Sequence, residues 1–595
     1  MKWTVWGSEA GIFLKQIKQQ GFNHAMRAIL WRLRMATAKL HLQAQEKLGW
    51  YRYSDWIRDH ERGQGLTPEP LLNPQLSYFV QISASSQSYL KDTLDSLVKQ
   101  SYSHWKAYVY STNSETPDTL INFYQHEPRI HWLLSAQVSP QFERIREQSG
   151  DWLGFLNAGD ILSTHALAFF VSQMELHPDA TIVYSDADKL TPDGLTRHDP
   201  SFWPDWSPEL LLSVNYLTRG LFRRAELLKA AANAVDLEEA ILRGSEGTGR
   251  IIHIPQVLCH VRDGQTFPWF ADIFHPNNLK AHLERSGLQG VTVQNSSTTG
   301  TPQFTWAYAQ TLVSIIILSR DQVGWLKRCI DSILTQTTYP HYEIILIENN
   351  SRERETFSYY EQLKSIPQVK VFIHNQAFNY SAFNNWGVQH AQGDLLLFLN
   401  NDIECIDPGW LDELARWACR PEVGIVGAKL LYPDHTIQHA GLVVGLEGHA
   451  NHIFAGCQEG YGGIFGSVEW YRDYSAVTGA CMMMRKAVYE QVGGFDENYL
   501  LAFNDIEICL RTIQAGYRVV YTPFARLIHH EGATRSTYKP AADISLASQH
   551  LKPLIEQGDP FFNPNLSLMS RIPTLHRRGE LSAIKKLELI SEFLS

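Results

Sequence analysis

A chain of 595 residues is too long for one hydrophobic core, so we expect two to four domains. Hydrophobic residues make up 44% of the chain and charged residues 19%, which is typical of globular proteins and excludes a largely disordered chain. The formal net charge of -10 disfavours a nucleic-acid partner, because such binding depends on clustered lysine and arginine side chains.

The cysteines and the apolar runs indicate in which cellular compartment the protein resides. The seven cysteines contain no CxxC pair and no disulfide-like pattern, which favours a reducing environment. We find no N-terminal stretch that resembles a signal peptide and no apolar run long enough to cross a bilayer. We therefore predict a cytoplasmic protein, either soluble or peripheral on the cytosolic face of the inner membrane.

Residues 1–75 predict a helical N-terminal extension. Between about Phe13 and Leu48, apolar residues alternate with lysine and arginine at helical spacing. A basic amphipathic helix of this kind can lie on an anionic membrane surface, but the same pattern more often packs on its own protein. Peripheral membrane contact is one of these two alternatives.

An internal repeat follows this extension. Segments 89–100 and 325–336 share a Leu-Lys pair, an Asp-Ser pair and a glutamine at the same spacing. Segment 150–157, Gly-Asp-Trp-Leu-Gly-Phe-Leu-Asn, likewise parallels segment 393–400, Gly-Asp-Leu-Leu-Leu-Phe-Leu-Asn. Duplicated segments indicate duplicated folds, so the sequence predicts two related domains in tandem.

The repeat units predict the fold class. In the second copy, β-rich runs at 313–318 and 343–347 flank a helical pattern at 325–334. Such alternation predicts α/β domains with mostly parallel sheets, whose ligands bind beyond the carboxyl ends of the strands. Segment 293–302 is rich in Ser, Thr, Gly and Pro and is interpreted as a linker. We place the domains at 76–295 and 303–540, with a helical C-terminal tail at 541–595.

Polar residues follow a predicted buried strand of the second copy. The strand at 395–399 runs directly into Asn400, Asn401 and Asp402. Mg2+ and Mn2+ prefer oxygen ligands, and a nucleotide diphosphate needs a cation to offset its charge. Asp402 is therefore a candidate metal ligand, although Asp at a strand end also initiates turns, and that structural alternative is equally open.

Further segments accompany this motif in order: Phe-Asn-Tyr-Ser at 378–381, Asn-Asn-Trp-Gly at 384–387, Gly-Asp at 393–394, Leu-Leu-Tyr-Pro-Asp at 430–434 and Val-Thr-Gly-Ala-Cys at 477–481. Together they resemble family 2 glycosyltransferases with the GT-A fold, in particular tandem-domain bacterial members that assemble polysaccharides such as O-antigen. The resemblance covers nearly all of the second copy. It implies a fold of two tandem GT-A domains.

The resemblance also implies a nucleotide-sugar site in the second copy. In the family an acidic residue, usually Asp, follows the second strand and contacts the nucleoside, and here the position is Glu348. The first residue of the aspartate motif is Asn400 instead of the common Asp, which leaves Asp402 as the stronger metal ligand. The residues expected at this site are Ser319, Glu348, Asn349, Asn385, Asn400, Asn401 and Asp402.

A catalytic base is implied at the segment 502–511, where Asp505 and Glu507 precede a helical pattern. An inverting transfer needs a carboxylate that takes the proton of the acceptor hydroxyl. Asp505 matches the base of the family, although Asn504 precedes it where many members have Glu. For Glu507 two interpretations are equal, a partner of the base or a residue that favours the helix dipole.

A closing histidine motif at 527–535 is expected to complete the metal site. His529 lies three residues before Gly532, as the family pattern places it, and imidazole is a common metal ligand. His530 is the alternative. The resemblance thus implies a divalent cation, Mn2+ or Mg2+, at Asp402 and His529.

The acceptor side is expected to include Gly479, Asp496 and Trp470, the last of these in the variable loop 445–471. A tryptophan in this place can stack on a sugar face, but aromatic side chains more often serve packing. The acceptor itself is expected to be a glycan or a lipid-linked glycan.

The first copy lacks the corresponding chemistry. Ser111 stands in the place of Glu348, and Gly159 in the place of Asp402, with Asp160 one residue further on. The segment that should supply the base is shortened to 235–243, where Asp236 and Glu239 are only loosely placed. We therefore expect a degenerate domain that acts as a scaffold or helps to hold the acceptor.

The predicted function is inverting transfer of a sugar from a nucleotide-diphosphate donor to a glycan in cell-surface polysaccharide synthesis. Asn400 and Asn504 keep a non-catalytic glycan-binding or assembly protein open as an alternative. A nucleotidyltransferase, which would release pyrophosphate from a nucleoside triphosphate, is a further alternative. A dinucleotide-dependent oxidoreductase is disfavoured because the glycine-rich segment 460–466 lacks the required spacing and context.

Overall fold

The computed structural model describes residues 51–61, 69–83, 86–111, 118–133, 150–234, 236–247, 249–264, 273–296, 299–530 and 539–594. The helix predicted between Phe13 and Leu48 lies outside these residues, as does Gly532 of the closing histidine motif.

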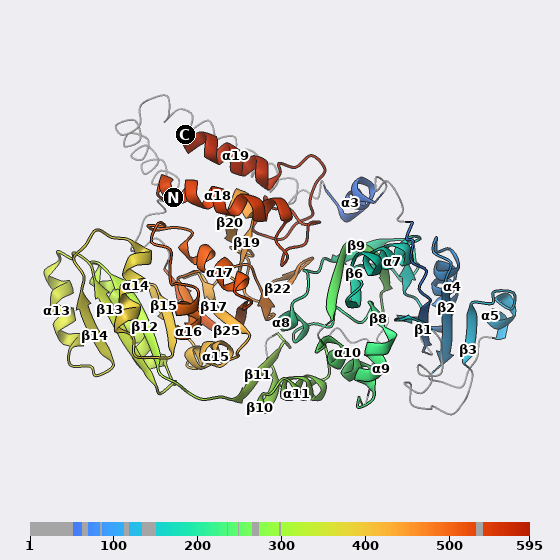
Figure 1. The fold of residues 1–595 in the computed structure, drawn as a ribbon, viewed down its shortest axis with the longest axis horizontal. Coiled ribbons are helices and arrows are strands. Elements are labelled where there is room, and N and C mark those ends of the chain that lie inside the picture. Colours follow the sequence, from blue (N-terminus) through green and yellow to red (C-terminus); the bar gives the residue numbers. More distant parts are fainter. Residues whose placement is uncertain are drawn as a thin grey trace.

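The first α/β domain is built on a mixed sheet with helices around it (Figure 1). Its strands are β1 (Leu76–Ile82), β2 (Trp105–Ser111), β3 (Ile130–Leu133), β4 (Trp152–Asn157), β5 (Ile161–Leu162), β6 (Ala180–Leu190), β7 (Arg197–Ser201), β8 (Leu221–Arg223) and β9 (Arg250–Arg262). The helices of this part of the chain are α3 (Tyr53–His60), η1 (Gln87–Tyr89), α4 (Leu90–Val98), α5 (Asp118–Phe123), α7 (Ala166–Leu176), α8 (Pro208–Leu211), α9 (Arg224–Ala231), α10 (Leu237–Ser245) and α11 (Pro276–Arg285).

The second domain repeats this plan. Its large sheet contains β12 (Val313–Ser319), β13 (Tyr342–Glu348), β14 (Val369–Ile373), β15 (Leu395–Leu399), β16 (Ile403–Cys405), β17 (Val423–Leu431), β18 (Ile437–His439), β23 (Arg472–Asp473), β24 (Cys481–Arg485) and β25 (Arg518–His529). Smaller pairs are β19 (Leu442–Val444) with β20 (Ala450–His452), and β21 (Gly462–Gly463) with β22 (Gly466–Ser467). The helices are α12 (Val323–Gln336), α13 (Arg354–Leu363), α14 (Tyr380–His390), α15 (Trp410–Ala418), η2 (Leu446–Gly448), α16 (Lys486–Gln491) and α17 (Asn504–Gln514).

The two sheets have the same strand order. The first runs β3-β2-β1-β4-β8-β6-β9-β5 and the second β14-β13-β12-β15-β24-β17-β25-β16. Their registers also correspond, because Leu76 faces Trp105 and Trp152 as Val313 faces Tyr342 and Leu395. The prediction of two tandem α/β domains is confirmed.

The sheets are less parallel than the sequence suggested. Strands β14, β13, β12 and β15 run parallel, but β24 is antiparallel to both of its neighbours, β15 and β17. The chain between β17 and β24 forms the small strands β18 to β23 and returns without a crossover helix. This long connection has no crossover α-helix of the kind that usually joins parallel strands, and β24 enters the sheet antiparallel to β17.

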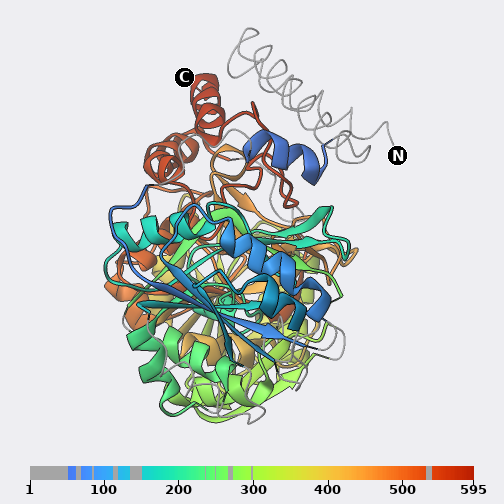
Figure 2. The ribbon, with the colours of Figure 1, turned by 90° about the vertical axis from the view of Figure 1, so that its right-hand side faces the viewer.

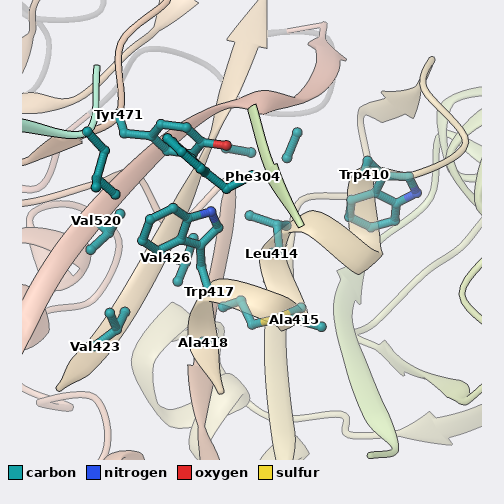
Figure 3. Close-up of a cluster of buried hydrophobic side chains, with 14 of the residues drawn as sticks. Phe304, Trp410, Leu414, Ala415, Trp417, Ala418, Val423, Val426, Tyr471 and Val520 are labelled. Carbon is teal, nitrogen blue, oxygen red and sulfur yellow. The ribbon is translucent and has the colours of Figure 1, made fainter. Parts of the chain in front are cut away.

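Two paired strands flank the predicted linker 293–302 and include its first and last residues. Strands β10 (Gln289–Asn295) and β11 (Pro302–Ala307) pair with each other. Phe304 of β11 lies 5.6 Å from the ring of Tyr471, and Trp306 lies 5.1 Å from Trp417 of α15. Figure 3 shows Phe304, Tyr471 and Trp417 together in a buried cluster with side chains of β17 and β25. The hairpin is therefore part of the core of the second domain.

Buried polar contacts join the two domains. The Ser207 hydroxyl donates to Asp473 at 2.6 Å, and Arg518 forms an ion pair with Glu209 at 2.7 Å. Trp203 of the first domain stacks on Trp470 of the second at 6.5 Å. Because Ser207, Glu209 and Asp473 are largely removed from water and bond across the joint, separation of the domains would be costly.

The C-terminal part of the chain spans both domains. It contains α18 (Ala541–Gln557) and α19 (Ala583–Leu594), which lie beside α3 at the top of Figures 1 and 2. Between the two helices, the Asn563 amide donates to the Asp186 carboxylate of the first domain at 2.9 Å. None of the helices in the described part of the chain has both the length and the apolar character that crossing a bilayer requires.

Candidate functional site

The carboxyl ends of adjacent strands bring the predicted donor residues to one edge of the second sheet. Ser319 ends β12 and faces Glu348, which ends β13. Asn400 follows β15, whose residue Leu399 faces Ile317 of β12. Neighbouring parallel strands end at the same edge, so these side chains share one side of the sheet.

Glu348 is fixed by its own surroundings. Its carboxylate accepts hydrogen bonds from the Ser351 backbone at 2.6 Å, the Ser351 hydroxyl at 2.5 Å and the Tyr360 hydroxyl at 2.7 Å. The Tyr360 hydroxyl also lies 3.3 Å from the hydroxyl of Ser319. Glu348 is only 1% exposed, so these hydrogen bonds hold its carboxylate in one orientation at the end of β13.

Asn349 has a structural contact. Its amide donates to the backbone oxygens of His374 at 3.1 Å and Gln376 at 2.9 Å, which fastens the loop after β14 to the end of β13. The loop after β14 is therefore held in place beside the edge where a ligand would bind.

Asn400, Asp402 and His529 converge where β16 and β25 pair. The Asp402 carboxylate lies 3.2 Å from His529 Nε2, and the Asn400 amide lies 3.3 Å from the same nitrogen. Asp402 is 4% exposed and His529 6%. Asn401, which is 9% exposed, completes the turn between Asn400 and Asp402.

The alternative histidine, His530, contacts residues other than Asp402 through its side chain. His530 Nε2 is 3.0 Å from the carboxylate of Glu404, and its ring lies 4.7 Å from that of Trp325. Of the two histidines, His529 is therefore the one beside Asp402.

Asp402 and His529 form a donor set that suits a cation shared with a diphosphate. His529 Nδ1 has no hydrogen-bond partner among the described residues, while Nε2 faces Asp402. Within the described residues there is no group of three His, Cys, Asp or Glu side chains that would hold a metal alone. Mg2+ is usually bound through one or two carboxylates together with substrate phosphates, so an Asp-His pair fits this role.

The loop Thr478–Ala480 connects the donor edge to the predicted base. The Gly479 backbone N–H donates to the Asp505 carboxylate at 3.0 Å. The next residue, Ala480, accepts a hydrogen bond from the Asn400 backbone at 3.0 Å. One short loop thus holds Asp505 and the Asp402 motif together.

Gly479 is the residue that the close approach requires. A Cβ atom at this position would lie 3.0 Å from the Tyr380 hydroxyl and 3.4 Å from Asp505 Cβ. The Tyr380 hydroxyl donates to the Gly479 carbonyl at 3.1 Å, so it cannot withdraw without losing that bond. A side chain here would press on the Tyr380 hydroxyl and fill the space next to Asp505.

Asp505 lies in the first turn of α17. One carboxylate oxygen accepts from Gly479 and the other from the Ile506 backbone at 2.9 Å, so the group is oriented by two N–H donors. Glu507 forms an ion pair with Arg511 on the same helix, which favours its structural interpretation. Asn504, the first residue of α17, is 4% exposed.

Two residues of the predicted site brace a neighbouring loop. The Asn385 amide donates to the Phe495 carbonyl at 2.9 Å and accepts from the Phe495 N–H at 2.9 Å. Asp496 follows directly and accepts from the Asn498 backbone at 3.0 Å. Trp470 instead faces the first domain, where it stacks on Trp203.

The first domain carries different groups at the corresponding positions. Ser111 faces Ile82 as Glu348 faces Ser319. Gly159 lies two residues beyond Asn157, at the position of Asp402, and a Cβ there would lie 3.4 Å from Arg262 Cβ.

Arg262 occupies the space beside Gly159. Its side chain is 1% exposed, forms an ion pair with Asp92 at 2.6 Å and lies 4.5 Å above the ring of Tyr89. Val261 stands at the position of His529, because Leu162 faces Cys259 as Cys405 faces Leu527.

The other carboxylates of the first domain serve its structure. Asp160 accepts from the Asn157 backbone at 3.0 Å, and burial raises its pKa against the opposing effect of Arg219. Asp236 caps α10 by accepting from the Glu239 N–H at 2.8 Å. Glu239 itself forms ion pairs with Arg243 and Arg285.

One pair of side chains at the site was missed by sequence reasoning. His439 of β18 lies 2.9 Å from His452 of β20, and its other ring nitrogen accepts from the Thr478 N–H at 3.4 Å. Isolated histidines carry no spacing signal, so only the fold brings them together.

Among solved structures, the mannosyltransferase PcManGT from Pyrobaculum calidifontis in complex with GDP-Man and Mn2+ is similar with a TM-score of 0.30 and 15% identity. The similarity covers 43% of this chain and 67% of that chain.

Sequence relatives match more of the chain. The O-antigen biosynthesis protein RfbC of Myxococcus xanthus is 37% identical over 548 residues, which cover 86% of this chain and 42% of that protein. The protein y4gI of Sinorhizobium fredii is 34% identical over 532 residues, covering 83% of this chain and 58% of that protein. The chain thus spans less than two thirds of the length of both relatives.

The family model described as Glycosyl transferase family 2 matches residues 314–493, which run from Ser314 of β12 past the end of β24 and include the loop Thr478–Ala480. This match and the relatives confirm the resemblance drawn from the motifs. The second α/β domain of this chain belongs to glycosyl transferase family 2.

Proposed function

We propose that the second domain transfers a sugar from a nucleotide-diphosphate donor to a glycan acceptor with inversion at the anomeric carbon. The observation that carries this proposal is the loop Thr478–Ala480, which hydrogen-bonds Asp505 on one side and Asn400 on the other. A base and a diphosphate-binding edge are thereby held side by side, as a single displacement requires.

The donor would bind across the ends of β12, β13 and β15. Glu348 would accept hydrogen bonds from the nucleoside, with Ser319, Asn349 and Asn385 shaping the surrounding edge. Asn400, Asn401 and Asp402 would meet the diphosphate and the sugar. The braced contacts of Glu348 support this role, because a pre-oriented carboxylate loses little entropy on binding.

Asp505 would act as the base. It takes the proton of the attacking hydroxyl while the acceptor oxygen bonds to the anomeric carbon and the bond from that carbon to the diphosphate oxygen breaks. The nucleotide diphosphate leaves from the opposite face, which inverts the anomeric configuration. The two N–H donors to Asp505 support this role, because they fix the direction of its lone pairs.

Asp402 and His529 would hold Mn2+ or Mg2+. The cation, when bound, supplies positive charge that offsets the charge developing on the leaving diphosphate. A single carboxylate and one imidazole leave most coordination positions of the cation to phosphate oxygens and water. We therefore expect the cation to bind tightly only together with the nucleotide.

The first domain would be a scaffold. Arg262 and Gly159 leave no carboxylate where the second domain has Asp402, and Ser111 offers no carboxylate to a nucleoside. The buried joint through Ser207, Glu209 and Trp203 supports a role in fixing the catalytic domain and in helping to hold the acceptor.

The acceptor would be a glycan or lipid-linked glycan of a cell-surface polysaccharide, as the name of the Myxococcus xanthus relative suggests for that protein. Gly479 and Asp496 are the proposed acceptor-side residues, whereas the stacking of Trp470 on Trp203 favours a packing role for that side chain. Transfer to such a glycan would occur in the cytoplasm, with peripheral contact to the membrane that carries the acceptor.

Thermal unfolding with a panel of UDP, GDP and dTDP, with and without Mn2+, tests the donor site. We expect one nucleotide to raise the midpoint in a Mn2+-dependent way, because a ligand of the folded state stabilises it. D402N should remove the Mn2+-dependent part. D394N is the matched control, since Asp394 is exposed at the opposite end of β15.

Product analysis tests the reaction. The nucleotide sugar selected by the panel should yield a glycoside of inverted anomeric configuration and the free nucleotide diphosphate. Glycan binding without transfer or hydrolysis would favour a binding module, and pyrophosphate release from a nucleoside triphosphate would favour a nucleotidyltransferase.

A further inference from the structure

Two histidines meet beside the predicted acceptor side. His439 and His452 approach each other through their Nδ1 atoms at 2.9 Å, with the rings nearly perpendicular at 86°. His439 is fully buried, whereas His452 is partly exposed. The pair is formed by the fold alone, because β18 reaches it from β17 and β20 from the hairpin with β19.

The backbone fixes where the protons of this pair lie. The Thr478 N–H can only donate, so His439 Nε2, which lies 3.4 Å away, must be the acceptor. A neutral His439 then carries its proton on Nδ1 and donates it to Nδ1 of His452. A neutral His452 must in turn carry its own proton on Nε2.

The surroundings keep both rings neutral. Burial, followed by the charges of His452 and His529, lowers the pKa of His439 well below its usual range. Burial, followed by Arg571, His529 and Lys539, lowers the pKa of His452 to about 3. Near neutral pH the His452 Nε2–H is therefore a fixed hydrogen-bond donor.

This donor has no partner in the described part of the chain. His452 Nδ1 is used by His439, while Nε2 makes no hydrogen bond and is not among the fully buried atoms. The hairpin that carries it is anchored, because Glu447 forms an ion pair with Arg571. A ligand that enters beside the loop Thr478–Ala480 would find an oriented N–H group.

The topology places this group on the acceptor side. The donor residues end β13, β12 and β15, whereas β18 pairs with β17, which lies beyond β24 in the sheet. His439 and Asp505 bind consecutive N–H groups of one loop, at Thr478 and Gly479. His452, through its contact with His439, and Asp505 are thereby both tied to the loop Thr478–Ala480.

We propose that His452 is an acceptor-binding residue whose Nε2–H donates to an oxygen of the acceptor sugar, and that His439 is a positioning residue that sets this proton through Thr478. The proposal rests on the proposed function, since it assigns the second substrate of the same site.

The proton positions are tested without any ligand. Nitrogen NMR of the full chain labelled with [15N]histidine, assigned through H439Q and H452Q, should find the proton of His439 on Nδ1 and that of His452 on Nε2 at neutral pH. A proton on Nδ1 of His452, or a charged His452, overturns the proposal.

The acceptor contact is tested with a glycolipid extract of bacterial cell envelopes as the acceptor and the nucleotide sugar selected by the panel. H452L should raise the half-saturating extract concentration about ten-fold, the usual effect of one lost hydrogen bond, without changing nucleotide diphosphate binding with Mn2+. H452Q retains an N–H donor and should recover most of the loss.

H435N is the matched control. His435 is exposed in the turn before β18 and should tolerate asparagine, which suits its positive φ of 62°. An unchanged acceptor response in H452L, or an equal loss of nucleotide binding, overturns the proposal. A wild-type chain that binds and hydrolyses no nucleotide sugar defeats the proposed function instead, while the NMR result judges the histidine pair separately.

Discussion

The two domains share one strand order and differ at the ends of their strands. Apolar strands such as β1 and β12 keep the same partners in the same register, while Ser111 replaces Glu348 and Gly159 replaces Asp402. The strands are retained because each buries its side chains on both faces, which packing enforces. Residues at the strand ends make local polar contacts outside the strand interiors, so they can change while the strands keep their packing.

The largest expected effect tests which of the two domains supplies the catalytic base. D505N should lower the transfer rate about a thousand-fold, because an amide cannot take the proton of the acceptor hydroxyl. D160N, in the first domain, should stay within about two-fold. Transfer rates at saturating donor measure both, and a loss in D160N with normal transfer in D505N would reverse the assignment.

The domains should also differ in their response to pH. His253 of β9 occupies the position of Tyr521 in β25 and lies 2.9 Å from Asp186. Burial opposes its charge, but Asp186 and Asp205 outweigh burial and raise its pKa to about 9 from 6.5. The raised pKa stabilises the fold below pH 6.5, and this stabilisation is lost as the pH rises through 9.

The shift corresponds to about 3 kcal/mol. Guanidinium unfolding followed by tryptophan fluorescence at pH 6.5 and pH 9 should show this loss in the first domain, and H253Q should abolish the difference. H198Q is the control, because His198 meets Asp199 and Asp263 at a more exposed place. An unchanged pH response in H253Q would assign the sensitivity to another group.

A smaller effect is expected where the domains differ in side-chain size. Leu217 stands at the position of Gly479, since Gly154 faces Leu221 as Leu397 faces Met483. G479A should lower the transfer rate about thirty-fold, or about 2 kcal/mol, because its Cβ crowds the Tyr380 hydroxyl and shifts the loop that orients Asp505. G324A, whose Cβ would meet nothing within 4 Å, should leave the rate unchanged. Equal rates in both variants would remove Gly479 from the site.

The smallest effect is expected at Glu348. E348Q should raise the donor KM about five-fold, the effect of a weakened hydrogen bond of roughly 1 kcal/mol, with little change in kcat. E355Q, on the exposed face of α13, should leave the donor KM as it is. A change in kcat alone would point to a role in the reaction step instead of nucleoside binding.

The sequence predicted the parts of the molecule that depend on local pattern. Alternating apolar runs located β12, α12, β13 and β15, and the repeat predicted two tandem domains, which is confirmed. The family assignment from the motifs is also confirmed. The roles of Asp505, Asp402 and His529 stay predictions, although the fold brings Asp402 beside His529.

Other parts depend on contacts between distant segments, which local pattern does not encode. The antiparallel course of β24 results from the long return through β18 to β23. The His439–His452 pair needs two separate small strands, and the segment that carries Asn563 shows no motif although it reaches the first domain. These contacts join residues that are far apart in the sequence, so the residue types within any one segment do not predict them.

The contact of Asn563 with Asp186 also orders events during synthesis. The two residues are 377 positions apart, so Asp186 leaves the ribosome roughly 20 to 75 seconds before Asn563 does, at about 5 to 20 residues per second. Until then Asp186 has His253 and the Trp203 N–H as partners but not the amide of Asn563. During that interval the Asp186 surface of the first domain is open, so the joint with the C-terminal segment can close only late in synthesis.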